Sequence, residues 1–257
     1  MVTRRIREHV RTHNWFAVAI DVLIVFLGVF LGIQANNWNE ARIAEKAANA
    51  DRARLIEDLR TNELDFEGRR VYYEDVRQHA LKALEGFSSP GADLGEAFLV
   101  NAYQASQIRA RPMRRFTYDE LVSTGGIARI GDDNLRARAA AYYLGLRTID
   151  TDLNNLPPYR DRIRREMPYA VQDRIRSRCG EQGREVSGAV IRRLPAACRT
   201  GLEPALIAQA VAQLRAVPEM DRDLTRYITD IDQKLNSYSG AQRRSRELRQ
   251  ALENSGN

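Results

Sequence analysis

One uninterrupted apolar stretch limits how this chain can fold. The 21 residues from Trp15 to Ala35 contain a single charged side chain, Asp21, and one amide. A helix rises 1.5 Å per residue, so this stretch is about 30 Å long and matches the hydrocarbon core of a bilayer. Tryptophan favours the membrane interfaces, and Trp15 and Trp38 bracket the stretch. The sequence therefore predicts one transmembrane helix over residues 15–35.

Two other interpretations of the stretch compete with a retained span. Ile33-Gln34-Ala35 loosely resembles the small-x-small cleavage site of a signal peptide. However, an apolar region of about 20 residues is too long for most signal peptides. A buried helix of a soluble protein is the second alternative, but such a helix is rarely apolar on every side. We therefore expect the stretch to stay in the mature protein as a membrane span.

Charges on the two sides of the stretch predict its orientation. Residues 1–14 hold four arginines and one glutamate, whereas residues 36–50 hold two basic and two acidic side chains. The positive-inside rule then places 1–14 in the cytoplasm as a basic tail and 36–257 on the other side of the membrane. Extending the second window to Leu55 equalises the basic residues at four each, which weakens the bias.

The same stretch carries a resemblance to a known family. Asp21 opens a Gly-rich apolar run that closes in Gln34-Ala-Asn-Asn-Trp-Asn-Glu40. Farther along stand Tyr118-x-x-Leu-x-Ser-x-Gly125, then Ile130, Leu135 and the pair Tyr142-Tyr143. Over residues 14–145 the chain resembles an uncharacterised bacterial family of single-span membrane proteins that carry a domain of unknown function. The resemblance implies an anchored helical protein, and it implies no known reaction. Combined with the orientation predicted from the charges, it leads us to expect a bacterial inner-membrane protein whose residues 36–257 lie in the periplasm.

Small residues follow one face of the predicted span. Asp21, Gly28 and Gly32 lie within about 40° of one another on a helix of 3.6 residues per turn. A Gly-x-x-x-Gly pattern lets two backbones approach closely, and an acid in hydrocarbon normally takes a protein or aqueous partner. This face predicts a homo-oligomer packed through the transmembrane helix. Alternatively, the glycines are ordinary residues of a span and water reaches Asp21.

Apolar spacing after the span predicts a mostly α fold. Between Asn36 and Phe87 there is no proline, and apolar residues recur at heptad-like spacing until Ser88-Ser-Pro-Gly91. The members of this stripe are Leu55, Leu59, Asn62, Phe66, Tyr73, Val76, Ala80 and Phe87. The span is therefore expected to continue as one long helix into an irregular extracytoplasmic helical bundle over residues 36–257.

Further helices are predicted from stop and start signals. They cover about Asp93–Ile108, a short segment opened by a capping box at Thr117–Glu120 and ended by Gly125-Gly126, and a segment capped by Asp132 that runs to about Leu153. Two more are expected over Tyr159–Arg178 and along a stripe from Met220 to Tyr238. Alternation typical of a strand is confined to the region near Val186–Ile191.

No catalytic, cofactor or metal motif is found in the sequence. His79 is the only histidine beyond the span, and His9 and His13 on the tail make a poor metal site. The nucleotide-binding loop, the serine nucleophile elbow and the zinc motif His-Glu-x-x-His are absent. We therefore expect no enzyme activity and no cofactor, although carboxylates brought together by folding could form a site that the sequence does not reveal.

Cys179 and Cys198 are the only two cysteines, and they enclose a Gly-rich segment of 18 residues. In an oxidising periplasm they would form a disulfide, worth about 3 kcal/mol from chain entropy. Two buried free thiols are the alternative.

The net charge of +6 can be assigned to one region. Residues 160–199 hold 11 arginines and five acidic residues, while the other residues balance at 29 basic and 29 acidic groups. The candidate basic patch consists of Arg160, Arg164, Arg165, Arg174, Arg178, Arg192 and Arg193. Such a patch could bind anionic headgroups or an acidic protein, or it could be a solvated face. Nucleic acid is disfavoured because no reader motif is present.

Together these features predict an interaction or scaffold protein anchored in the lipid bilayer. Its partner would be an unidentified protein or an anionic lipid. The alternative is a periplasmic sensory or ligand-binding domain that signals through a membrane partner. A pocket with convergent polar groups would favour the sensor, and a continuous apolar groove would favour the interaction protein.

Overall fold

The computed structural model describes residues 15–89, 94–109, 111–153, 156–186 and 189–255. In these ranges the chain is mostly helical, with eight α-helices, one 3₁₀ turn and one hairpin. The predicted mostly α fold is confirmed. The basic tail 1–14 with its two histidines, the Pro90-Gly91 stop signal and the Asn154-Asn155 break lie outside the described residues.

Helix α2 (Trp15–Ser88) holds both the apolar stretch and the apolar stripe that follows it. It ends at the residue where the sequence predicts a stop. Every residue of the predicted stripe is buried except Phe87, which is half-buried. The heptad-like spacing therefore identified the buried face of this helix.

The described chain separates into two compact units, residues 1–50 and 51–257. In the first unit only helical residues 15–50 are described. Their most apolar 18-residue window has a mean hydropathy of 2.4, and none of it is buried. Large apolar side chains are therefore exposed along this segment, from Trp15 at 70% to Ile33 at 55%.

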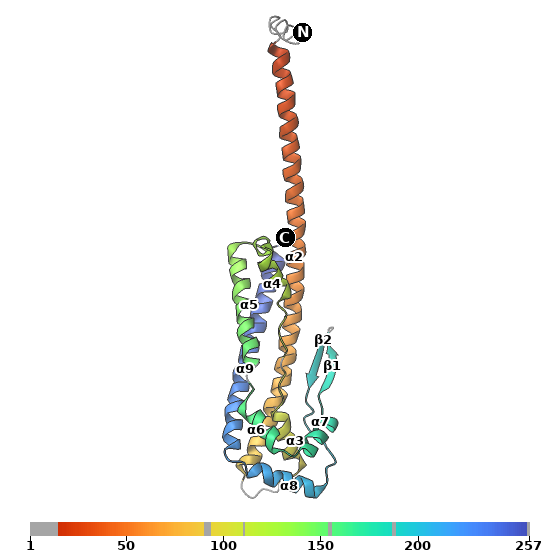
Figure 1. The fold of residues 1–257 in the computed structure, drawn as a ribbon, viewed down its shortest axis with the longest axis vertical. Helices are drawn as coiled ribbons and strands as arrows, with labels where there is room; N and C mark the ends of the chain where they lie inside the picture. Colours follow the sequence, from red (N-terminus) through yellow and green to blue (C-terminus); the bar gives the residue numbers. More distant parts are fainter. Residues whose placement is uncertain (1–14, 90–93, 110, 154–155, 187–188, 256–257) are drawn as a thin grey trace, which may run out of the picture. The chain divides into compact units, whose positions relative to one another are not determined.

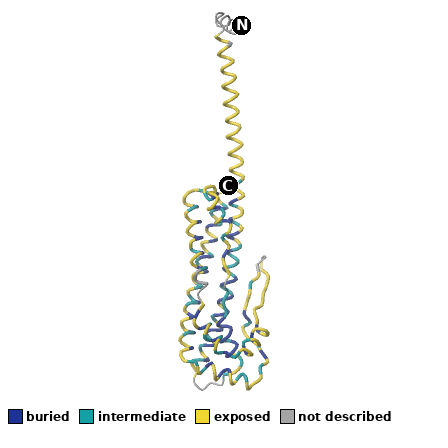
Figure 2. The backbone as a smooth tube through the Cα atoms, viewed as in Figure 1, coloured by how far each residue is buried: buried dark blue, intermediate teal, exposed yellow. Residues whose placement is uncertain are grey.

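The second unit is a helical bundle built on residues 51–88 of α2. Helices α5 (Asp133–Leu153) and α9 (Met220–Asn254) lie alongside it (Figure 1). Helix α9 runs antiparallel to α2, since Ser245 Oγ donates to the Leu59 carbonyl while Arg77 pairs with Asp232 farther along. Buried residues follow the contacts among these helices (Figure 2).

Shorter helices close one end of the bundle. They are α3 (Glu96–Ala105), α6 (Pro158–Glu166), α7 (Tyr169–Arg178) and α8 (Pro204–Arg215), and they contact one another. Helix α4 (Phe116–Ser123) and the 3₁₀ turn η1 (Gly126–Arg129) pack near the other end, where Arg129 pairs with Asp51 of α2.

Local signals explain where several elements begin and end. Gly125 takes a positive φ of 73° after α4, as expected for the predicted glycine stop. The Asp132 carboxylate accepts a hydrogen bond from the Leu135 N–H at 2.8 Å, so the predicted cap of α5 is confirmed. The single predicted helix over Tyr159–Arg178 is wrong: it breaks into α6 and α7 because Pro168 keeps Met167 in extended backbone.

Two other elements differ from the sequence-based expectations. Thr117 lies inside α4 rather than at its N-cap, which is Arg115 and makes no side-chain cap bond, so the predicted capping box is wrong. The weak alternation belongs to an antiparallel hairpin of β1 (Gln182–Val186) and β2 (Ala189–Arg193). Helix α8 was not expected from the sequence.

Candidate functional site

The predicted oligomer face is exposed on α2. Asp21, Gly28 and Gly32 are all exposed, and a Cβ added to either glycine would meet no atom within 4 Å. On a 3.6-residue helix the opposite side carries Phe26 and Phe30, whose rings stack 6.3 Å apart. The glycine face therefore has room for a second backbone to approach.

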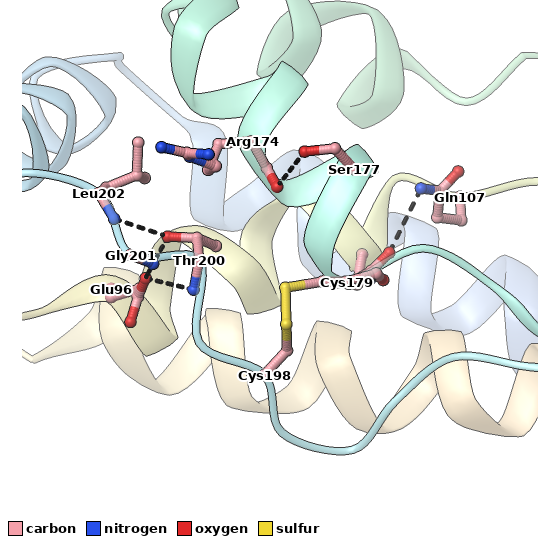
Figure 3. Close-up of a disulfide and its surroundings, with 10 residues drawn as sticks. Glu96, Gln107, Arg174, Ser177, Cys179, Cys198, Thr200, Gly201 and Leu202 are labelled. Carbon is pink, nitrogen blue, oxygen red and sulfur yellow. Dashed lines mark hydrogen bonds between the residues drawn. A yellow bond between two sulfur atoms is a disulfide. The ribbon is translucent and has the colours of Figure 1, made fainter.

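The two cysteines are joined. Figure 3 shows the disulfide between Cys179, the residue after α7, and Cys198. The Cα atoms lie 5.7 Å apart, and Cys179 is buried. Gln104 of α3 donates to the Cys179 carbonyl at 2.6 Å, so the bridge is fixed to the core at this end.

Polar contacts continue beyond the disulfide toward α3. The Glu96 carboxylate accepts hydrogen bonds from the N–H groups of Thr200 and Gly201 and from the Thr200 hydroxyl (Figure 3). These bonds lower the pKa of Glu96, against the effect of its partial burial. The segment that follows Cys198 is therefore fixed to the start of α3.

Two members of the predicted basic patch hold the end of α3. Arg160 donates to the Ser106 carbonyl, and Arg164 donates to Ser106 Oγ at 3.0 Å and to Gln107 Oε1 at 3.2 Å. The Arg164 guanidinium also lies 4.6 Å from the centre of the Tyr103 ring. Burial lowers the pKa of Arg160. The two arginines therefore hydrogen-bond the residues that end α3 and hold this end of the helix in place.

The other members lie apart from this pair. Arg165 pairs with Asp161, Arg192 lies near Glu181, and Arg193 makes two hydrogen bonds to Asp75 at 2.8 and 2.6 Å. Arg174 and Arg178 are exposed on α7. The structure therefore divides the seven arginines among several tasks rather than gathering their guanidinium groups at one site.

A cavity of about 440 Å³ lies between α9 on one side and Ile149 and residues 156–158 on the other. Its described lining combines apolar and polar side chains: Ile149, Leu156, Pro157, Pro158, Arg226, Tyr227, Asp230, Gln233, Lys234, Ser237 and Tyr238. Sequence reasoning identified Tyr238 as part of the α9 stripe but missed the cavity, because the polar residues beside that stripe are ordinary for an exposed helix face.

Two arginines near the bundle core carry nitrogen atoms without hydrogen-bond partners in the described part of the chain. They are Arg69, which is 1% exposed, and Arg109, each through Nη1. Arg69 also donates to the Arg111 carbonyl. Arg69 stands three residues after Phe66 and four before Tyr73, so helical spacing places it on the same buried face of α2.

His79 is buried within α2, and its Nδ1 donates to Asn101 Oδ1 at 2.8 Å. Within the described ranges, no group of three or more His, Cys, Asp or Glu side chains is placed to hold a metal ion.

Comparison of the chain with protein-family models, with curated proteins and with solved structures gave no match.

Proposed function

We propose that this protein is a single-span membrane protein that presents a helical interaction domain to partners outside the cytoplasm. The observation that carries the proposal is the exposed apolar segment of α2, whose most apolar window is entirely unburied. Exposing so many large apolar side chains to water is unfavourable, whereas a bilayer accepts them. The charge asymmetry supports a cytoplasmic tail over residues 1–14 and a periplasmic domain over 36–257, and the family resemblance supports an anchored helical protein.

Exposed apolar side chains on the second unit support an interaction role. Phe116 is 78% exposed, Leu144 is 64% exposed and Val122 is 50% exposed. Phe116 and Val122 belong to α4, and Leu144 belongs to α5. Tyr118 and Tyr143 stack at 4.1 Å and hold these two helices together. Aromatic side chains are enriched in protein interfaces, so the exposed Phe116 ring is the strongest of these three in support of that role.

Membrane extraction and topology reporters test the anchor. The full chain should stay in the pellet after alkaline carbonate washing. A version with Leu23, Phe26 and Leu27 replaced by glutamate should lose that retention, because charge at the centre of a span is costly.

A topology reporter tests the orientation. Alkaline phosphatase fused after Asn257 should be active, since it folds only outside the cytoplasm. A soluble wild-type chain, or an inactive fusion beside an active cytoplasmic reporter, contradicts the proposal.

The span is also proposed to form a homo-oligomer through Asp21, Gly28 and Gly32. The space above both glycines supports this, because backbone approach needs a face without side chains. The variant Gly28→Ile/Gly32→Ile should lose crosslinking between copies in native membranes. Phe26→Ile/Phe30→Ile, which changes the opposite side, is the matched control and should crosslink like the parent. Equal crosslinking of all three chains excludes this face.

A further inference from the structure

Three exposed arginines stand around the disulfide. Arg174 and Arg178 are one turn apart on α7, so they share a face of that helix. The bridge places Cys198 beside Cys179, with Cα atoms 5.7 Å apart (Figure 3). Consecutive Cα atoms are about 3.8 Å apart, so the Cα atoms of Arg178 and Arg199 are separated by at most about 13 Å. Arg174, Arg178 and Arg199 are called the arginine cluster below.

The arginine cluster has no acidic partner in the described part of the chain. None of its three side chains makes an ion pair or a hydrogen bond there. Nearby acidic side chains have other contacts: Asp173 pairs with Arg176 at 2.7 Å, and Glu181 accepts from the Tyr72 hydroxyl at 2.7 Å. Glu203 is exposed and pairs with none of the three. The three guanidinium groups are therefore open to an anionic partner.

The macrodipole of α7 accounts for only part of this arrangement. Positive charge is favourable in the last turn of a helix, and Arg178 is the last residue of α7. Arg199 is exposed and belongs to no helix. Helix stabilisation therefore leaves the position of the third arginine unexplained.

The surface around the arginine cluster lacks large apolar side chains. Within the described residues, none is exposed between Ala170 and Glu185 or after Arg193. Protein interfaces are enriched in aromatic residues at their centre, whereas an anionic headgroup layer attracts arginine through charge. A guanidinium group also matches phosphate oxygens through two parallel hydrogen bonds. These features favour a phosphate-bearing lipid surface over an acidic protein.

We propose that the arginine cluster docks on a bilayer surface that carries anionic phospholipid headgroups. The inference rests on the interaction role proposed above and names the chemistry of one partner. The two can fail separately, because carbonate washing tests the anchor, whereas contact with added vesicles tests the cluster.

Energy transfer to added vesicles tests the proposal on the full chain in phosphatidylcholine nanodiscs. A donor dye is attached to Ser177→Cys, an exposed position of α7 between Arg174 and Arg178, and an acceptor dye is attached to the vesicle headgroups. Because the donor is on α7, transfer reports contact at the cluster rather than at residues 1–14. Vesicles of equal parts phosphatidylglycerol and phosphatidylcholine should give saturable transfer. Vesicles of phosphatidylcholine alone should give none.

Removing the charges of the cluster should weaken this contact. Arg174→Gln/Arg178→Gln/Arg199→Gln should lower the apparent affinity for the anionic vesicles about a hundredfold. Each arginine at an anionic surface contributes about 1 kcal/mol, which is about fivefold in affinity.

A second triple variant removes the same charge elsewhere: Arg165→Gln/Arg176→Gln/Arg222→Gln. Each of these arginines is exposed and already pairs with a carboxylate three or four residues away, so this variant should bind like the parent. Circular dichroism confirms that both variants are folded.

Four outcomes overturn the proposal. They are absence of transfer to the anionic vesicles, equal transfer to both vesicle compositions, equal loss in the two triple variants, and binding of a polyglutamate peptide at the cluster without binding of the vesicles. The last of these would identify an acidic protein as the partner.

Discussion

At the residue scale, His79 couples the fold to pH. Its ring is 2% exposed, and burial is the main cause that lowers its pKa, with the charge of Lys82 acting in the same direction. The bond to Asn101 and the charge of Asp75 oppose this effect without reversing it. The native protein therefore takes up a proton on His79 at a lower pH than the unfolded chain, whose histidine does so near pH 6.5.

The stability that depends on neutral His79 is present above pH 6.5 and is lost as the pH falls below it, because the unfolded state then binds more protons. His79→Gln should flatten the fall in the free energy of unfolding between about pH 7 and 5. Urea titrations of the full chain in detergent at several pH values measure this. His9 and His13 are shared by parent and variant, so their contributions cancel. Parallel pH profiles contradict the prediction.

Arginines that looked equivalent in the sequence should differ in their effect on stability. Arg193 pairs with the buried carboxylate of Asp75, which also accepts from the Leu194 N–H at 3.0 Å. Arg193→Gln should lower the free energy of unfolding by about 1–2 kcal/mol, a value reduced because Arg193 itself is exposed and screened. Arg178→Gln is the matched control and should change stability by less than about 0.5 kcal/mol. Equal losses would show that the Asp75 pair contributes nothing specific.

At the element scale, contacts distant in sequence decided what local patterns could not. The stripe from Leu55 to Ala80 predicted the buried face of α2, because helix periodicity is a local property. The start of α4 was predicted wrongly because its partner is Asp58, 59 residues earlier, whose carboxylate accepts from the Thr117 N–H at 3.3 Å. The cavity was likewise not predictable, since residues 156–158 and the α9 residues that line it are about 70 residues apart in the sequence.

The long-range cap of α4 gives a prediction for this element. Asp58→Ala leaves an N–H in the first turn of α4 without its carboxylate and should cost about 1 kcal/mol of stability. Glu57→Ala is the control, because Glu57 is exposed and its ion pair with Arg60 is long, at 3.8 Å. Thermal unfolding monitored by circular dichroism compares the two variants. If Glu57→Ala destabilises the chain as much as Asp58→Ala, the cap makes no measurable contribution.

At the scale of the whole molecule, one helix contributes to both compact units. Helix α2 continues through the boundary between Ala50 and Asp51 without a break. The sequence allowed this continuity to be predicted, because no proline interrupts residues 36–87. How Arg160, Arg164, Arg192 and Arg193 are used could not be predicted, since their partners Ser106, Glu181 and Asp75 come from other segments of the fold.

The disulfide closes a segment that contains the exposed hairpin. It links the end of α7 to the segment after β2, and β1 between them is exposed throughout. Other contacts between this segment and α2 are the hydrogen bonds of Arg193 and Leu194 to Asp75 and of the Tyr72 hydroxyl to Glu181. Removing the bridge frees a loop of this length in the unfolded chain, so Cys179→Ser/Cys198→Ser should lower the free energy of unfolding by about 3 kcal/mol.

The full chain in detergent should show this loss as a fall in melting temperature of about 2–4 °C per kcal/mol. Wild type treated with reductant should melt at the same temperature as the double variant, whereas reductant should leave the melting temperature of the variant unchanged. This comparison separates loss of the bond from side effects of serine.

Alkylation of the wild type without reductant, followed by mass spectrometry, measures the bond in the protein as extracted from cells. Because cytosolic thiols stay reduced, two unlabelled cysteines support a periplasmic domain, and two labelled cysteines contradict that location.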